Sequence, residues 1–197
     1  MHNALAILAG IIAIVAAIPY IKDTLKGKTR PNVVTWVTWT LLNAITAIAA
    51  FAGGARQTAI FATALGICTG LIVIVGLRDG LKKYSVFDVT CQILAVVGIV
   101  LWRITNSPDL AITFTITASF IGSLPTYRHA WRLPREETWQ FYALDGFSAI
   151  VAVTSVAHFN FIGLGYPVYI VLSDYSIMSV VLARLKTLPR LEAQISK

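Results

Sequence analysis

Two carboxylates, Asp145 and Asp174, stand inside long apolar segments of this sequence. An ionisable side chain inside a membrane-spanning helix costs roughly 2.5–3.5 kcal/mol on insertion scales, so such a group suggests a function by default. At about 1.5 Å of helix per residue, Asp145 lies about 9 Å and Asp174 about 16 Å from the same end of their segments. No lysine or arginine lies at a comparable depth. We therefore expect both carboxylates to face one cavity and to bind a proton or a cation; the alternative is a structural hydrogen bond to a neighbouring helix.

Aromatic and amide side chains are predicted to share this cavity. Trp36, Trp39 and Asn43 are spaced so that they lie on one helical face. Aligned repeats place Asn43 and Asp145 at nearly equivalent levels. With Tyr142 and Tyr169 they complete the predicted substrate-binding set. Two alternatives stay open: the tryptophans anchor the helix at a membrane boundary, and Asn43 forms a hydrogen bond between helices.

Prolines interrupt three of the apolar segments. Pro19, Pro125 and Pro167 each lack a backbone N–H, and proline can bend a helix where it removes a hydrogen bond. We predict that they act as hinges. For Pro19 and Pro125 the alternative is a plain helix end.

The composition is that of a membrane protein throughout. Hydrophobic residues make up 57% of the 197 residues and charged residues 13%, whereas a soluble domain carries about 25% charge. The net charge of +7 comes from short loops between apolar runs, which excludes a nucleic-acid-binding face. The sequence has no nucleophile–base constellation, metal-ligand cluster or phosphate loop, so we expect no enzyme, metal or cofactor. Cys68 and Cys91 fit packing roles.

Seven apolar segments are long enough to span a bilayer, which takes about 20 residues. We therefore expect an all-α integral membrane protein with the spans Asn3–Tyr20, Val33–Phe51, Thr58–Leu77, Asp88–Ile104, Leu110–Tyr127, Trp139–His158 and Ile162–Leu185. They divide into a first three-helix repeat (1–80), a linker helix (81–108) and a second three-helix repeat with the C-terminal tail (109–197).

An internal likeness supports the 3+1+3 division. In both halves an apolar segment reaches a proline, Pro19 or Pro125, a basic loop follows, and the next apolar segment opens with Thr-Trp at Trp36 or Trp139. A single linker helix lets both triplets insert in the same orientation, which is the parallel-repeat arrangement of transporters. Such proteins hold their substrate at the interface between the repeats.

The basic residues are distributed unevenly between the two ends of the spans. Of the 16 lysines and arginines, 14 fall on the side that carries the loop after span one and the C-terminal tail. Only Arg56 and Arg103 fall on the other side. The positive-inside rule then places the 14 in the cytoplasm. We expect a multi-pass protein of the cell membrane with its N-terminus outside and its C-terminus cytoplasmic.

This arrangement resembles the SWEET and PQ-loop superfamily, whose members have seven helices as 3+1+3 and a proline near the cytoplasmic end of helices one and five. Their Pro-Gln dipeptide is Pro19-Tyr20 and Pro125-Thr126 here, so only the prolines match. Trp36 and Trp39 also resemble, more distantly, the WxxW of PnuC vitamin transporters.

The resemblance implies a small-solute transporter of the sugar, amino acid or vitamin class that works by alternating access, with proton coupling as a further hypothesis. The alternative is a non-transporting membrane receptor or assembly protein of the same fold. Expected partners are a small-molecule solute, protons and the lipid bilayer. The sequence does not set the oligomeric state, so a homo-oligomer is left open.

The charge asymmetry predicts the topology. A cysteine introduced beside Lys26 and one in the C-terminal tail should react with a membrane-impermeant reagent only from the cytoplasmic side. Labelling of the tail from outside intact cells would contradict this orientation.

Overall fold

The structure, a computed structural model, describes residues 1–79 and 107–195, together with positions 85–87, 89, 90, 93, 100 and 104. Most of the predicted linker helix and of its span Asp88–Ile104, including Arg103, lies outside the described residues. Elsewhere the described chain is all-helical, as expected. Its elements are α1 (His2–Leu25), α2 (Val33–Ala52), α3 (Arg56–Asp79), α5 (Pro108–Arg132), the short 3-10 helix η1 (Pro134–Glu136), α6 (Trp139–Ser155) and α7 (Phe161–Ile195).

Five of these helices, α1, α2, α3, α5 and α7, are long and apolar enough to cross a membrane. Helix α6 has 17 residues and ends at Ser155, before the predicted end at His158. It stops there because Val156 takes an extended conformation and Asn160 caps the next helix, its Oδ1 accepting a hydrogen bond from Gly163 N at 2.8 Å.

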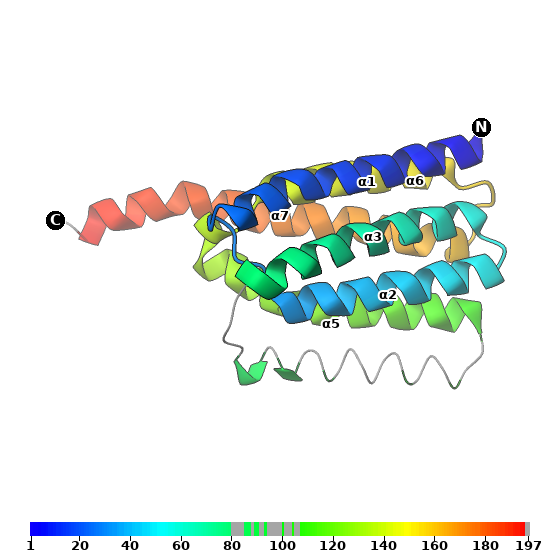
Figure 1. The fold of residues 1–197 in the computed structure, drawn as a ribbon, viewed down its shortest axis with the longest axis horizontal. Helices are drawn as coiled ribbons and strands as arrows, with labels where there is room; N and C mark the ends of the chain where they lie inside the picture. Colours follow the sequence, from blue (N-terminus) through cyan, green and yellow to red (C-terminus); the bar gives the residue numbers. More distant parts are fainter. Residues whose placement is uncertain are drawn as a thin grey trace.

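The six α-helices of the described chain pack as a closed ring. Helix α3 lies between α1 and α2, and α7 lies between α5 and α6. The ring is closed by contacts of α1 with α6 and of α2 with α5, so the chain forms three layers of two helices (Figure 1). The loop 26–32 joins α1 to α2, and the loop 133–138 joins α5 to α6. Neither pair of helices is adjacent in the ring.

The two ends of the bundle differ. One end, here named the loop end, carries the α1–α2 loop (26–32) and the α5–α6 loop (133–138). The other, the turn end, carries the α2–α3 turn (53–55) and the α6–α7 loop (156–160) (Figure 1). The N-terminus lies at the turn end and the C-terminus at the opposite end of the molecule. Large apolar side chains such as Ile11, Ile48 and Ile74 are exposed on the outer faces, as lipid contact requires.

The three predicted hinge prolines all lie within helices. Helix α1 continues past Pro19 to Leu25, and α5 continues past Pro125 to Arg132. Pro167 lies inside α7. The alternative that Pro19 and Pro125 mark helix ends is therefore wrong. Their action as hinges stays a prediction.

Small residues let α1 approach its neighbours closely. Its inward face carries Ala6, Ala9, Ala13, Ala16 and Ala17, all at most 1% exposed. Gly10 lies on the same helix, and a Cβ there would come within 2.8 Å of Ala64 Cβ on α3. Two glycines of α3, Gly66 and Gly70, are less tightly packed. A Cβ on Gly66 or Gly70 would meet α2 atoms only at 3.6 or 3.7 Å.

We predict that Gly10→Ala destabilises the bundle, because the alanine Cβ of residue 64 has no flexible atoms that can move aside. Overpacking of this kind costs about 1–3 kcal/mol, measured as a lower melting temperature of the detergent-solubilised protein. Gly70→Ala is the matched control and should have little effect. The double variant Gly10→Ala with Ala64→Gly should recover the stability, and a double variant no better than the single one would contradict the contact.

Candidate functional site

The helical ring surrounds a central cavity in which about 30 Å³ admits the centre of a water molecule. That room suffices for one or two waters. The walls come from every helix of the ring except α1. They consist of Trp36, Trp39, Asn43, Leu65, Thr69, Ser119, Phe141, Asp145, Tyr166, Tyr169, Ile170, Ser173 and Asp174.

The two predicted carboxylates meet in this cavity. Asp145 on α6 and Asp174 on α7 are 5% and 7% exposed, and their carboxyl groups interact directly. Ser148 Oγ donates to Asp145 Oδ1 at 3.3 Å. No hydrogen-bond donor in the described part of the chain reaches Asp174 Oδ2. Buried carboxylate oxygens side by side repel unless a proton or cation lies between them.

Aromatic rings form much of the remaining wall. Trp36 and Trp39 pack edge to face with ring centroids 5.0 Å apart, and Trp39 Nε1 donates to Ser119 O at 3.5 Å. Tyr166 Oη donates to Asn43 Oδ1 at 2.6 Å, which joins α7 to α2 across the ring. This bond is the interhelical contact that the sequence left as the alternative for Asn43, and Asn43 lines the cavity as well.

Six of the seven predicted substrate-binding residues line the cavity, namely Trp36, Trp39, Asn43, Asp145, Tyr169 and Asp174. Tyr142 is not part of its wall, and its role in substrate binding stays a prediction. Its hydroxyl donates to Glu137 Oε2 at 3.0 Å, since α6 begins at the loop end and Glu137 is buried just before it.

The structure adds cavity residues that the predicted set omitted. Tyr166 lies one helical turn from Tyr169, so helical periodicity on α7 was the available signal. Phe141 lies four residues before Asp145 and shares its face for the same reason. Ser119 and Thr69 are common helix residues on segments without a charged or aromatic neighbour in the cavity, and no sequence pattern distinguishes them.

An aromatic cluster closes the cavity toward the loop end. Tyr20 packs against Trp36 with centroids 4.9 Å apart and against Phe141 at 5.4 Å. Phe141 also contacts Trp36 at 5.2 Å and Tyr142 at 5.2 Å. All four rings are at most 2% exposed. A solute would therefore pass only if these rings moved apart.

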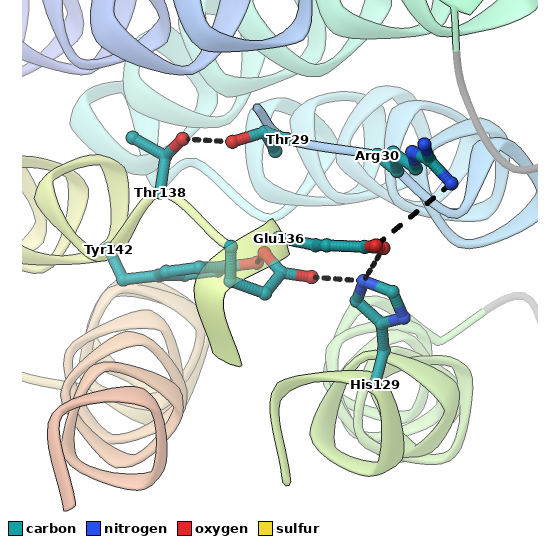
Figure 2. A network of polar contacts seen from close by, with 7 residues as sticks. Thr29, Arg30, His129, Glu136, Thr138 and Tyr142 are labelled. Atoms are coloured by element: carbon teal, nitrogen blue, oxygen red, sulfur yellow. Dashed lines mark hydrogen bonds and ion pairs between the residues drawn. The ribbon is translucent and has the colours of Figure 1, made fainter. Parts of the chain in front are cut away.

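Beyond the cluster, polar contacts join the two loops of the loop end (Figure 2). Thr29 and Thr138 share a hydrogen bond between their Oγ1 atoms at 2.5 Å, and Thr138 Oγ1 also donates to Asp23 Oδ2 at 3.1 Å. Arg30 N donates to Glu136 O at 3.2 Å, while the Arg30 guanidinium lies 4.0 Å from Glu136 Oε1. The exposed ion pair contributes little by itself, so the buried threonine pair is the main link.

Glu137 is the buried acid of this network. Four titratable groups face it: Glu136, Tyr142, Tyr20 and His129, whose Nε2 lies 4.0 Å from Glu137 Oε1. Burial raises the pKa of Glu137 from 4.5 to about 8, and the charge of Glu136 adds to the rise, whereas the hydrogen bonds from Tyr142 and Tyr20 oppose it. His129, to which the sequence assigned no role, also lies 3.6 Å from Glu136 Oε2.

The turn end is closed by direct contacts between the two halves of the chain. Thr58 Oγ1 donates to Gly163 O at 2.6 Å, and His2 Nδ1 lies 3.0 Å from Ser155 O. A second hollow lies at this end, with about 190 Å³ for water centres. Its wall consists of Gly53, Gly54, Ala55, Gln57, Thr58, Val156, His158, Asn160 and Gly163.

Comparison of the chain with protein-family models, curated proteins and solved structures finds no match to any of them. The geometry of the cavity and its two closed ends therefore carries the functional assignment.

We predict that stability falls with rising pH because of Glu137. Between its ordinary pKa and about 8 the folded state holds one proton more than the unfolded state, so unfolding becomes easier as pH rises. From about pH 5 to pH 8 the loss is of order 4 kcal/mol at about 1.4 kcal/mol per unit. Thermal melts of Glu137→Gln should lack this contribution to the pH slope. Asp109→Asn, an exposed carboxylate on α5, is the control, and an unchanged slope in Glu137→Gln would contradict the assignment.

Proposed function

We propose that the protein is a small-solute membrane transporter that works by alternating access. The observation that carries the proposal is the central cavity, which holds two buried carboxylates and is closed toward both ends of an apolar helical ring. In its present form the cavity admits only about 30 Å³ of water centres, so it corresponds to an occluded state. Ligand pockets for small molecules enclose about 300–1,000 Å³, so binding would require the helices to separate.

Helix contacts support the proposed 3+1+3 parallel repeat. When α1, α2 and α3 are matched with α5, α6 and α7, each contact of the first triplet has a counterpart in the second: α1–α3 with α5–α7, and α2–α3 with α6–α7. The contacts between triplets, α1–α6 and α5–α2, also exchange with each other. A pseudo-twofold axis through the cavity would produce this pattern, and parallel-repeat transporters bind substrate on such an axis.

Two further features support a family assignment. Helix α3 ends at the loop end and α5 begins at the turn end, as a seventh, linking span would require. Pro19 and Pro125 occupy matching places in α1 and α5. We therefore include membership of the SWEET and PQ-loop superfamily in the proposal, with the N-terminus outside the cell and the loop end in the cytoplasm.

The prolines suggest how the loop end would open. The helix segments after Pro19 and Pro125 carry Asp23 and His129 and lead directly into the two joined loops. Bending at both prolines, where a backbone hydrogen bond is missing, would separate the loops and withdraw Tyr20 from Trp36. The turn end would open by loss of the Thr58–Gly163 bond. Coupling to protons is part of the proposal, with Asp145 and Asp174 as the proton-binding groups.

Alternating access can be tested without knowing the solute. In a variant with Cys68 and Cys91 replaced by serine, Ser173→Cys places a single reporter in the cavity. We expect a membrane-impermeant methanethiosulfonate reagent to label it from either side of proteoliposomes. Adding Thr29→Cys and Thr138→Cys and oxidising them should lock the loop end, because their Oγ1 atoms are 2.5 Å apart. Labelling should then persist only from the turn-end side.

The protein with Ser173→Cys as its single cysteine, treated with the same oxidant, is the matched control and should keep labelling from both sides. Labelling from one side only, before and after locking, would contradict transport. That result would favour the alternative of a receptor with a pocket open to one side.

A further inference from the structure

We propose that the central cavity takes an organic cation, an amine or quaternary ammonium group carried on a small apolar or aromatic body. This inference rests on the proposed function in that it names the substrate class of the same cavity. It is built on three observations: the buried carboxylate pair, the state of the hydrogen-bond donors in the wall, and the aromatic rings around them.

The charges of the cavity favour a cation. Among its described residues the wall includes two aspartates and no lysine, arginine or histidine. Asp174 lines the cavity and is only 7% exposed. No described donor reaches its Oδ2 atom. A buried charge is stable only when it is paired or coordinates a cation. A positive group between Asp145 and Asp174 would supply what both carboxylates lack.

Three hydrogen-bond donors of the wall are already engaged, whereas Asp174 Oδ2 accepts from no described donor. Tyr166 Oη donates to Asn43, Thr69 Oγ1 donates to Leu65 O at 2.9 Å, and Trp39 Nε1 donates to Ser119 O. An anion, or a neutral solute bound mainly through its own oxygen acceptors, would find these three donors already occupied. A solute that donates hydrogen bonds or carries positive charge would satisfy the carboxylates directly.

The rings decide between an organic cation and an inorganic ion. Five described residues of the wall are aromatic: Trp36, Trp39, Phe141, Tyr166 and Tyr169. The face of an aromatic ring attracts a cation within about 6 Å of its centroid, most strongly for tryptophan. Rings cannot replace the water ligands of sodium or potassium as carbonyl oxygens do. They do pack against the methyl or methylene groups of an organic cation.

Binding can be measured as a rise in melting temperature of the full-length protein in detergent. The probes are tetramethylammonium, choline and benzyltrimethylammonium, which keep their charge at every pH. We expect all three to bind, and dimethylbutanol, the uncharged isostere of choline, to bind at least about tenfold more weakly. Glucose and glutamate should not stabilise the protein. The proposal is wrong if none of the three cations binds, or if sodium chloride stabilises the protein as much as they do at equal concentration.

Variants test the residues. Asp174→Asn should weaken choline binding by about tenfold or more, because a charged hydrogen-bond partner is lost. Asp109→Asn should not change it. If Asp174→Asn does not fold, Trp39→Phe and Trp39→Leu decide, since the first keeps an aromatic face and the second does not. The site would be overturned if Trp39→Phe and Trp39→Leu bound choline equally well and if Asp174→Asn, where it folds, bound choline as tightly as the unchanged protein.

Uptake of radiolabelled choline into proteoliposomes with an acidic interior separates this inference from the proposed function. Accumulation that Asp174→Asn abolishes would support both, with protons leaving as the cation enters. Cation binding without uptake of any probe would support the cation site and contradict transport. Uptake of glucose with no binding or uptake of the cations would support transport and overturn the cation site.

Discussion

The structure depends on the burial of two carboxylates in an apolar helical bundle. Asp145 and Asp174 come from different helices and meet in one cavity, so neither faces the apolar outer surface. Burying a charge is costly unless a partner compensates it. The hydroxyl of Ser148 donates a hydrogen bond to Asp145 Oδ1, but it carries no charge that could neutralise the carboxylate. The bundle thus maintains a place that is favourable only for a proton or a cation.

The same ring that encloses the carboxylates also explains how the cavity is sealed. The two loops of the loop end join helices that are not adjacent in the ring, α1 to α2 and α5 to α6. The two loops meet through Thr29 and Thr138, and the aromatic cluster around Trp36 fills the space beneath them. Closure at this end is therefore built from contacts between the two halves of the chain, which can separate without breaking either half.

Packing on either side of the cavity is close where rigidity is needed. Helix α1 contributes no side chain to the cavity wall, and its alanine face packs against α3 and α6. Small residues allow such backbone approach in the absence of a hydrophobic driving force between helices in lipid.

The polar residues of the loop end serve a different purpose. Burial raises the pKa of Glu137 to about 8, so its protonation changes just above neutral pH, at the point where the loops join.

Hydrophobic run length and charge placement alone determined the helical class, the approximate positions of six helices, and the presence of carboxylates inside apolar segments. These follow from local physics, because a chain in lipid must satisfy its backbone hydrogen bonds within each segment. Helix α7 runs to Ile195, well past the predicted end at Leu185. Six members of the cavity were also predictable, since helical periodicity places Trp36, Trp39 and Asn43 on one face. Only the tertiary structure decided that Tyr166 binds Asn43 and that Tyr142 turns to Glu137. It also decided that α6 ends at Ser155. Those outcomes depend on which distant helix packs alongside and how far each is rotated, and a helix's own sequence specifies its faces but not its neighbours.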